Sequence, residues 1–224
     1  MTFARTTLDV LAKDLRLEMR GKHAVNLLLP FVGATLVLLG LALGPGRTLL
    51  RPATPALIWV TLLFATLLSV RRAFEVEQED GALEGLVLVP ADKGAIYLGK
   101  VLASTIWLLL LAVAAGLMAA VLFDVPVVEN PAVALGGLVL GILGLSAVGC
   151  FFAGLVVSAR AREAILPLLV LPLVVPVALG AIGATSLGLA GDGGERLSWL
   201  LLLLAFDAVF LACGVLLFDK VLED

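Results

Sequence analysis

Six long stretches with almost no charged side chains dominate the sequence and limit what the chain can fold into. Five contain no Asp, Glu, Lys or Arg, and the sixth contains one acid. A membrane-spanning helix needs about 20 mostly apolar residues, so each stretch holds one span, and none is long enough for two spans and a turn. The expected spans cover residues 24–43, 53–70, 101–123, 132–157, 164–188 and 197–218.

The composition excludes a water-soluble protein. Hydrophobic residues make up 62% of the 224 positions and charged residues 15%, whereas soluble domains run at about 45–50% and about 25%. A net charge of −3 also argues against nucleic-acid binding. Because the stretches lack the alternation of a membrane β-barrel, we expect an all-α integral membrane bundle of six helices.

The basic residues predict the orientation of the bundle, because Lys and Arg concentrate in cytoplasmic loops. With both termini in the cytoplasm, twelve of the fifteen Lys and Arg residues lie on that side. The predicted topology is therefore N-in and C-in.

The arm before the first span, residues 1–23, has the pattern of an amphipathic helix. Its apolar residues recur at helical spacing and share one face, namely Ala4, Leu8, Leu11, Leu15 and Met19. Such a helix is typical of the membrane interface. The same stripe also fits a helix that packs on the bundle from below.

The largest polar segment is the loop between the second and third spans, residues 71–99. Asp80 or Gly81 can cap a short helix, Glu84 in its first turn suits the helix dipole, and Pro90 ends it. Leu83 lies on its apolar edge. This pattern predicts a docking element for a cytoplasmic partner, and an ordinary solvated loop is the alternative.

One motif near the end of this loop is misleading. The segment from Gly94 to Lys100 fits the start of the phosphate-binding G-x-x-x-x-G-K motif, but Val101 replaces the required Ser or Thr. We therefore expect no nucleotide site in this chain. Lys100 is expected to extend to the cytoplasmic interface, as lysines near span ends do.

Two features inside the spans are unusual for lipid-embedded helices. Asp207 lies halfway along the last span, where an acid is by default a functional candidate. It would serve as a proton relay, a coupling site or a pathway-lining group, or else be protonated and hydrogen-bonded to a neighbouring helix. Pro167, Pro172 and Pro176 interrupt the fifth span, and they predict either a kink beside a cavity or a moving part, or a purely structural bend.

Metal or haem ligation is not expected in this chain. Such sites need arrays of His, Cys or Met, and the sequence has one histidine and two cysteines, Cys150 and Cys213, in separate spans. The cysteines are best interpreted as small apolar fillers.

The arm and the loop resemble type-2 ABC exporter permeases, and more narrowly the CcmB family, the haem exporter permease subunits of the cytochrome c maturation ABC complex. The resemblance rests on the arm from Lys13 to Arg20, on Arg71, Arg72 and Phe74, and on the closing Tyr97-Leu98-Gly99-Lys100. It also rests on the acidic run, which contributes Glu75, Glu77, Glu79, Asp80, Gly81, Leu83, Glu84, Gly85 and Pro90.

The resemblance implies one ABC-2-type transmembrane domain over residues 1–224 that is not itself an enzyme. A separate CcmA-like ATPase would bind the ATP and dock on the loop, and two permease copies would pair with two ATPases. CcmC-, CcmD- and CcmE-like proteins would be membrane partners, and haem would be handled by the wider complex. The implied location is the bacterial cytoplasmic membrane.

The resemblance leaves several functions open. ATP hydrolysis would drive either haem export or the release of a haem-loaded chaperone. The chain would otherwise export another substrate, work as a proton-coupled secondary transporter using Asp207, or serve as a passive scaffold.

Overall fold

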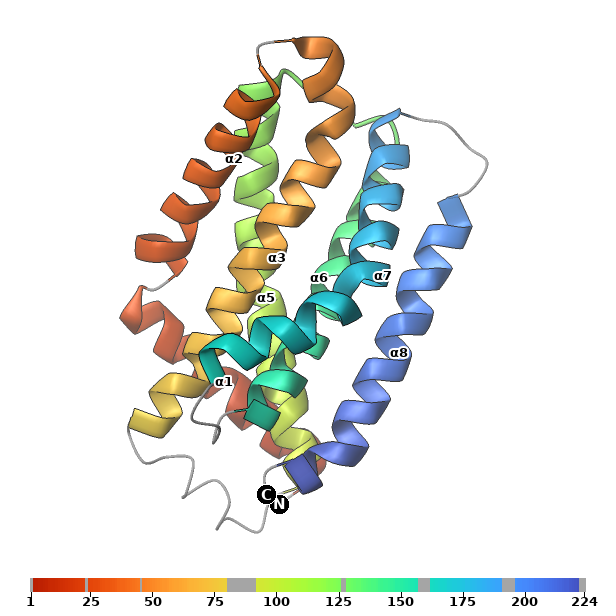
Figure 1. Ribbon diagram of the computed structural model, residues 1–224. Coiled ribbons are helices and arrows are strands. Elements are labelled where there is room, and N and C mark those ends of the chain that lie inside the picture. The colour runs from red at the N-terminus through yellow and green to blue at the C-terminus, as the bar shows by residue number, and fades with distance from the viewer. Residues whose placement is uncertain are drawn as a thin grey trace.

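The protein is a helical bundle in a computed structural model that describes residues 2–22, 24–44, 46–79, 92–125, 128–156, 162–190 and 196–221. Within these described residues, six helices are long and apolar enough to cross a membrane, as predicted. Figure 1 shows these helices running between two ends, with both termini at one of them. We call this the basal end.

The helices follow the predicted order along the chain. They are α1 (Phe3–Gly21), the π-helical turn η1 (Ala24–Leu28), α2 (Leu29–Leu43), α3 (Arg47–Glu79), α5 (Lys93–Phe123), α6 (Pro131–Val156), α7 (Arg162–Ala190) and α8 (Arg196–Val221). Each of the six predicted spans coincides with one helix, except that η1 and α2 together form the first.

The centre of the bundle is α6, which packs against α3, α5, α7 and α8. Glycines allow these close approaches. A Cβ on Gly137 would lie 2.6 Å from Ala184 of α7, and one on Gly154 would lie 2.6 Å from Phe218 of α8. Small residues at such positions let helix backbones approach closely, which is how helices associate in lipid.

The bounds of α3 and α5 correct the predicted loop. We expected residues 71–99 to form a loop, but α3 continues to Glu79 and α5 begins at Lys93. The charges that we took as the end of the span do not end the helix, because a helix continues beyond its apolar part wherever water or a partner meets its polar side chains. The start of α5 is fixed by Asp92, whose side chain accepts a hydrogen bond from the Gly94 N–H at 2.9 Å.

The three prolines of the fifth span do not break it. Pro167, Pro172 and Pro176 all lie inside the continuous helix α7. Figure 1 shows α7 bent, with its first part oblique to the bundle axis and its second part running along it. Each proline removes one backbone hydrogen bond and displaces the preceding turn, which accounts for the bend.

The arm forms α1, as predicted, and it packs on the bundle mainly through residues outside the apolar stripe. Thr6, Thr7 and Val10 are buried against the bundle, whereas Leu8 and Met19 of the stripe are 61% and 65% exposed. Leu11 and Leu15 of the stripe are partly buried. The helix thus packs on the bundle, and the exposed part of its stripe also suits the membrane interface.

Candidate coupling site

The two helices that flank residues 80–91 meet around a buried lysine at the basal end. Lys100 of α5 is 3% exposed, and its Nζ lies 3.4 Å from Asp14 Oδ2 of α1. The same ammonium lies 4.7 Å from the centre of the Phe74 ring of α3, within the range of a cation–π interaction. Lys100 thus joins α1, α3 and α5 at one point. We call Asp14, Phe74, Tyr97 and Lys100 the basal junction.

The burial of Lys100 corrects one prediction. We expected this side chain to extend to the cytoplasmic interface, but it is enclosed and paired. A buried ammonium is costly unless a counter-ion and further polar contacts offset its lost hydration. Asp14 and the Phe74 ring provide these contacts.

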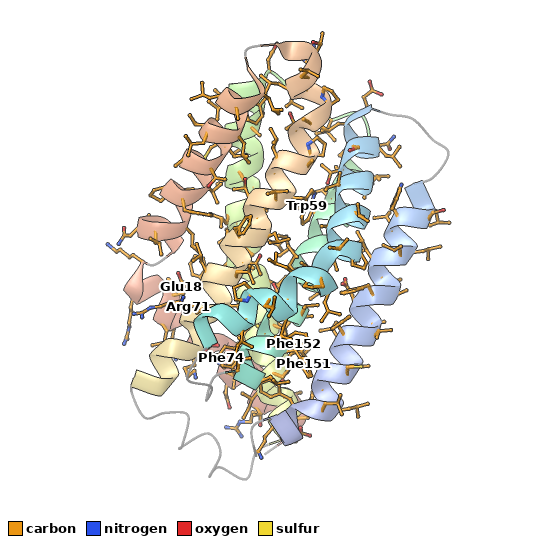
Figure 2. All side chains as sticks on the ribbon, in the orientation of Figure 1. Glu18, Trp59, Arg71, Phe74, Phe151 and Phe152 are labelled. Carbon is orange, nitrogen blue, oxygen red and sulfur yellow. The ribbon has the colours of Figure 1, made fainter. Side chains whose placement is uncertain are left out.

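Tyr97 ties the first turns of α5 to the two helices on its other side. Its ring is fully buried, and its hydroxyl donates to the Ala147 carbonyl of α6 at 3.0 Å, with the Phe210 carbonyl of α8 at 3.4 Å. The ring also lies 5.2 Å from that of Phe218 and 6.5 Å from that of Phe151. Figure 2 shows Phe74, Phe151 and Phe152 at this basal level. The base of α5 is therefore bonded to α6 and packed against α8.

Two glycines bring neighbouring helices onto the α5 base. A Cβ on Gly99 would lie 2.8 Å from the Thr7 carbonyl and from Val10 Cβ, so α1 crosses α5 directly at this residue. A Cβ on Gly94 would lie 2.5 Å from the Val215 carbonyl of α8. The Thr7 hydroxyl also lies 3.2 Å from the Ala95 carbonyl. The base of α5 is thus held on all sides.

The predicted arginines lie beside the junction. Arg71 and Arg72 belong to the last turns of α3, and Figure 2 shows Arg71 at the same level of the bundle as Glu18 of α1. A hollow of about 480 Å³ separates the second half of α1 from the end of α3, lined by Asp14, Leu17, Glu18, Arg20, Gly21, Arg72 and Ala73. Both helices thus present charged groups to one cleft.

The rest of the predicted docking element falls outside the described part of the chain. This holds for Asp80, Gly81, Leu83, Glu84, Gly85 and Pro90. Glu75, Glu77 and Glu79 belong to α3, but the structure describes only their backbone.

Asp207 lies in the middle of the bundle, 2% exposed. Its carboxylate points from α8 toward α6, where a Cβ on Gly144 would lie 2.6 Å from Oδ1 and 3.2 Å from Val177 of α7. Neither carboxylate oxygen has a hydrogen-bond partner among the described residues. The predicted hydrogen bond to a neighbouring helix is therefore not seen in that part of the chain.

A second hollow lies toward the opposite end of the bundle, between α3, α5, α6 and α7. Its volume is about 440 Å³, and its lining is mostly small and aliphatic, including Ala112, Gly116 and Ala134. Trp59 is one wall, and its indole N–H donates to the Thr185 hydroxyl at 2.9 Å. Figure 2 shows Trp59 well above the basal junction. The described residues contain no group of three or more His, Cys, Asp or Glu that could hold a metal ion.

Sequence reasoning missed the role of Asp14, Tyr97 and Lys100 as one junction. The signal for the start of α5 was present, because Asp92 directly precedes a helix-forming run and is a preferred N-cap residue. The pairing of Asp14 with Lys100 carried no such signal, since 86 positions separate them.

Comparison with known proteins supports the resemblance over almost the whole chain. The family model described as CcmB protein matches residues 5–223. Heme exporter protein B of Pseudomonas aeruginosa is 35% identical over 194 residues, which cover 85% of this chain and 86% of that protein. Heme exporter protein B of Paracoccus denitrificans is 37% identical over 187 residues, covering 81% and 83%.

Proposed function

The chain belongs to the CcmB family, and on this premise we propose that it is the membrane permease subunit of an ABC complex in c-type cytochrome biogenesis. In this proposal it is not an enzyme. It couples ATP hydrolysis by a separate ATPase subunit to haem export or to the release of a haem-loaded chaperone. Relatives named heme exporter protein B support the haem-related role.

The basal junction is the observation that carries the coupling role. The segment proposed to receive the ATPase, residues 75–90, begins in the last turns of α3 and precedes α5 in the chain. Phe74 and Lys100, close to these two ends, contact each other, and Tyr97 bonds onward to α6. A partner that displaces the segment would therefore move several spans together. Coupling of this kind requires a rigid element that moves as a unit between two arrangements.

The family also supports a set of partners and a location. We propose a CcmA-like ATPase on the basal end, a second copy of this chain, and CcmC-, CcmD- and CcmE-like proteins in the membrane. ATP would be bound by the ATPase and haem handled by the wider complex. Nucleic acid has no place in this function. The proposed location is the bacterial cytoplasmic membrane.

The first test is co-purification with the ATPase subunit. The two proteins are expressed together, extracted in mild detergent and assayed for co-elution and ATP turnover, with and without Glu84→Lys. We expect co-elution, and we expect the reversed charge at the docking element to abolish coupling while the chain still inserts. Normal cytochrome c assembly in cells carrying Glu84→Lys would contradict the proposal.

The matched control is Glu129→Lys. Glu129 is exposed and follows α5 at the opposite end of the bundle, so the same charge change falls far from the basal end. We expect this variant to keep co-elution, ATP turnover and cytochrome c assembly. If both variants lose turnover equally, the loss reflects the charge reversal and not the docking element.

Asp207 supports a second candidate, a proton-coupled transporter. A buried carboxyl with no described partner is costly and is typical of proton pathways. The test is Asp207→Asn, which keeps the shape and removes the ionisable group. The coupling proposal predicts that cytochrome c assembly and ATP turnover stay normal. Loss of assembly with a folded protein, together with transport in the absence of the ATPase, would favour the second candidate.

A further inference from the structure

The position of α1 on the bundle suggests that it does more than rest at the membrane interface. It packs chiefly on α5, and the crossing point is Gly99, where the Thr7 carbonyl and the Val10 side chain of α1 lie directly on the α5 backbone. The hollow of about 480 Å³ separates its second half from α3. Helix α1 therefore packs more extensively on α5 than on α3.

The connection from α1 to the first span is also special. Helix α1 is followed by its C-cap residue Lys22, a non-glycine residue in the left-handed region with φ 51°, a conformation that non-glycine residues rarely adopt. The π-helical turn η1 separates this point from α2. Both features are local departures from α-helical geometry, and π-helical turns often mark functional positions. A displacement of α1 would reach α2 through them.

The Asp14–Lys100 pair is an ion pair that links α1 to α5, in addition to the hydrogen bond from the Thr7 hydroxyl to the Ala95 carbonyl. Asp14 is 13% exposed and Lys100 3%, so the pair is largely removed from water. Buried ion pairs contribute little net stability compared with apolar replacements, but removing one partner leaves an uncompensated charge. Such a pair fixes one arrangement of its two helices rather than strengthening the fold in general.

From these observations we propose that α1 is a moving part of the coupling apparatus, and that Lys100 is the positioning residue that makes α1 follow the base of α5. This inference rests on the proposed function, since the displacement originates in the docking segment between α3 and α5. The movement would carry the exposed apolar stripe of α1 through the membrane interface and pull on α2.

The experiment measures the position of α1 in two nucleotide states of the assembled complex. In a background with Cys150→Ala and Cys213→Ala, spin labels are placed at Leu8 of α1 and Leu204 of α8, both exposed. Their distance is measured without nucleotide and with ATP trapped by vanadate. We expect the distance to change between the two states.

The variants Lys100→Met and Asp14→Asn test this ion pair. Each is expected to abolish the nucleotide-dependent distance change and to lower ATP-coupled cytochrome c assembly by about fivefold or more, the range of ordinary coupling energies. Lys100→Arg keeps the positive charge, and we expect this variant to retain both the distance change and cytochrome c assembly. Asp14 is more exposed than Lys100, so Asp14→Asn provides the test if Lys100→Met does not fold.

Lys13→Met is the matched control. Lys13 Nζ also lies 3.4 Å from the Asp14 carboxylate, at Oδ1, but both members of this pair belong to α1, so the pair does not link α1 to α5. We expect this variant to keep the distance change. An unmodified complex that hydrolyses ATP while α1 stays fixed would overturn the inference, as would a Lys100→Met complex that keeps the change. Failure to bind the ATPase at all would instead refute the proposed function.

Discussion

Single glycines decide how closely the helices of this bundle approach, and Gly214 shows the effect most clearly. A Cβ at Gly214 of α8 would overlap the ring of Tyr97, which is buried and held by its hydrogen bond to Ala147. We expect Gly214→Ala to lower the free energy of unfolding in detergent by about 1–3 kcal/mol, the usual cost of overpacking.

Gly116→Ala provides the comparison at the same scale. A Cβ on Gly116 meets nothing within 4 Å, and alanine is favoured over glycine inside a helix by about 1 kcal/mol. We expect an unchanged or slightly higher unfolding free energy. Equal losses in the two variants would show that contact with Tyr97 is not the cause.

At the scale of the element, α1 presents three different faces. Thr7 and Val10 face the bundle, Leu8 belongs to the exposed apolar stripe, and Asp9 lies on the charged face. The test places a spin label at Leu8 or at Asp9 of the protein in membranes. We expect the Leu8 label to collide more often with oxygen, which concentrates in lipid, than with a water-soluble nickel complex. We expect the Asp9 label to collide more often with the nickel complex than with oxygen. Equal exposure of both labels to the nickel complex would contradict an interfacial helix.

The elements themselves were largely predictable, because an uncharged stretch of about 20 residues has few alternatives to a membrane helix. The ends of α3 and α5 were not. Arg71 and Arg72 continue α3 as helix although they are charged, and Lys100 is buried because Asp14 and Phe74 come to it from elsewhere in the chain. The residues next to Lys100 in the sequence give no sign of either of these two partners. The surroundings of Asp207 depended in the same way on Gly144 and Val177 of other helices.

At the scale of the whole molecule, an even number of spans returns the chain to the side where it began. Figure 1 shows both termini at the basal end, in agreement with the prediction that both termini lie on the same side of the membrane. The excess of Lys and Arg predicts that this side is the cytoplasm. The basal junction would then face the compartment that holds ATP.

Reporter fusions test this orientation. We expect green fluorescent protein fused after residue 224 to fluoresce, and alkaline phosphatase inserted between residues 191 and 195 to be active, because the phosphatase folds only outside the cytoplasm. Phosphatase fused after residue 224 is the control and should be inactive. The reverse pattern would place the basal junction outside the cell and contradict docking of a cytoplasmic ATPase.

The Asp14–Lys100 pair also has a consequence for how the protein is made. The two residues are 86 positions apart, so α1 leaves the ribosome well before its partner on α5 exists. Until then Asp14 has no Lys100 to neutralise it, and only the apolar stripe holds α1 at the bilayer surface. We therefore expect the nascent chain to wait with its first helix at the headgroups and its first two spans inserted. The arrival of the third span then completes the basal end.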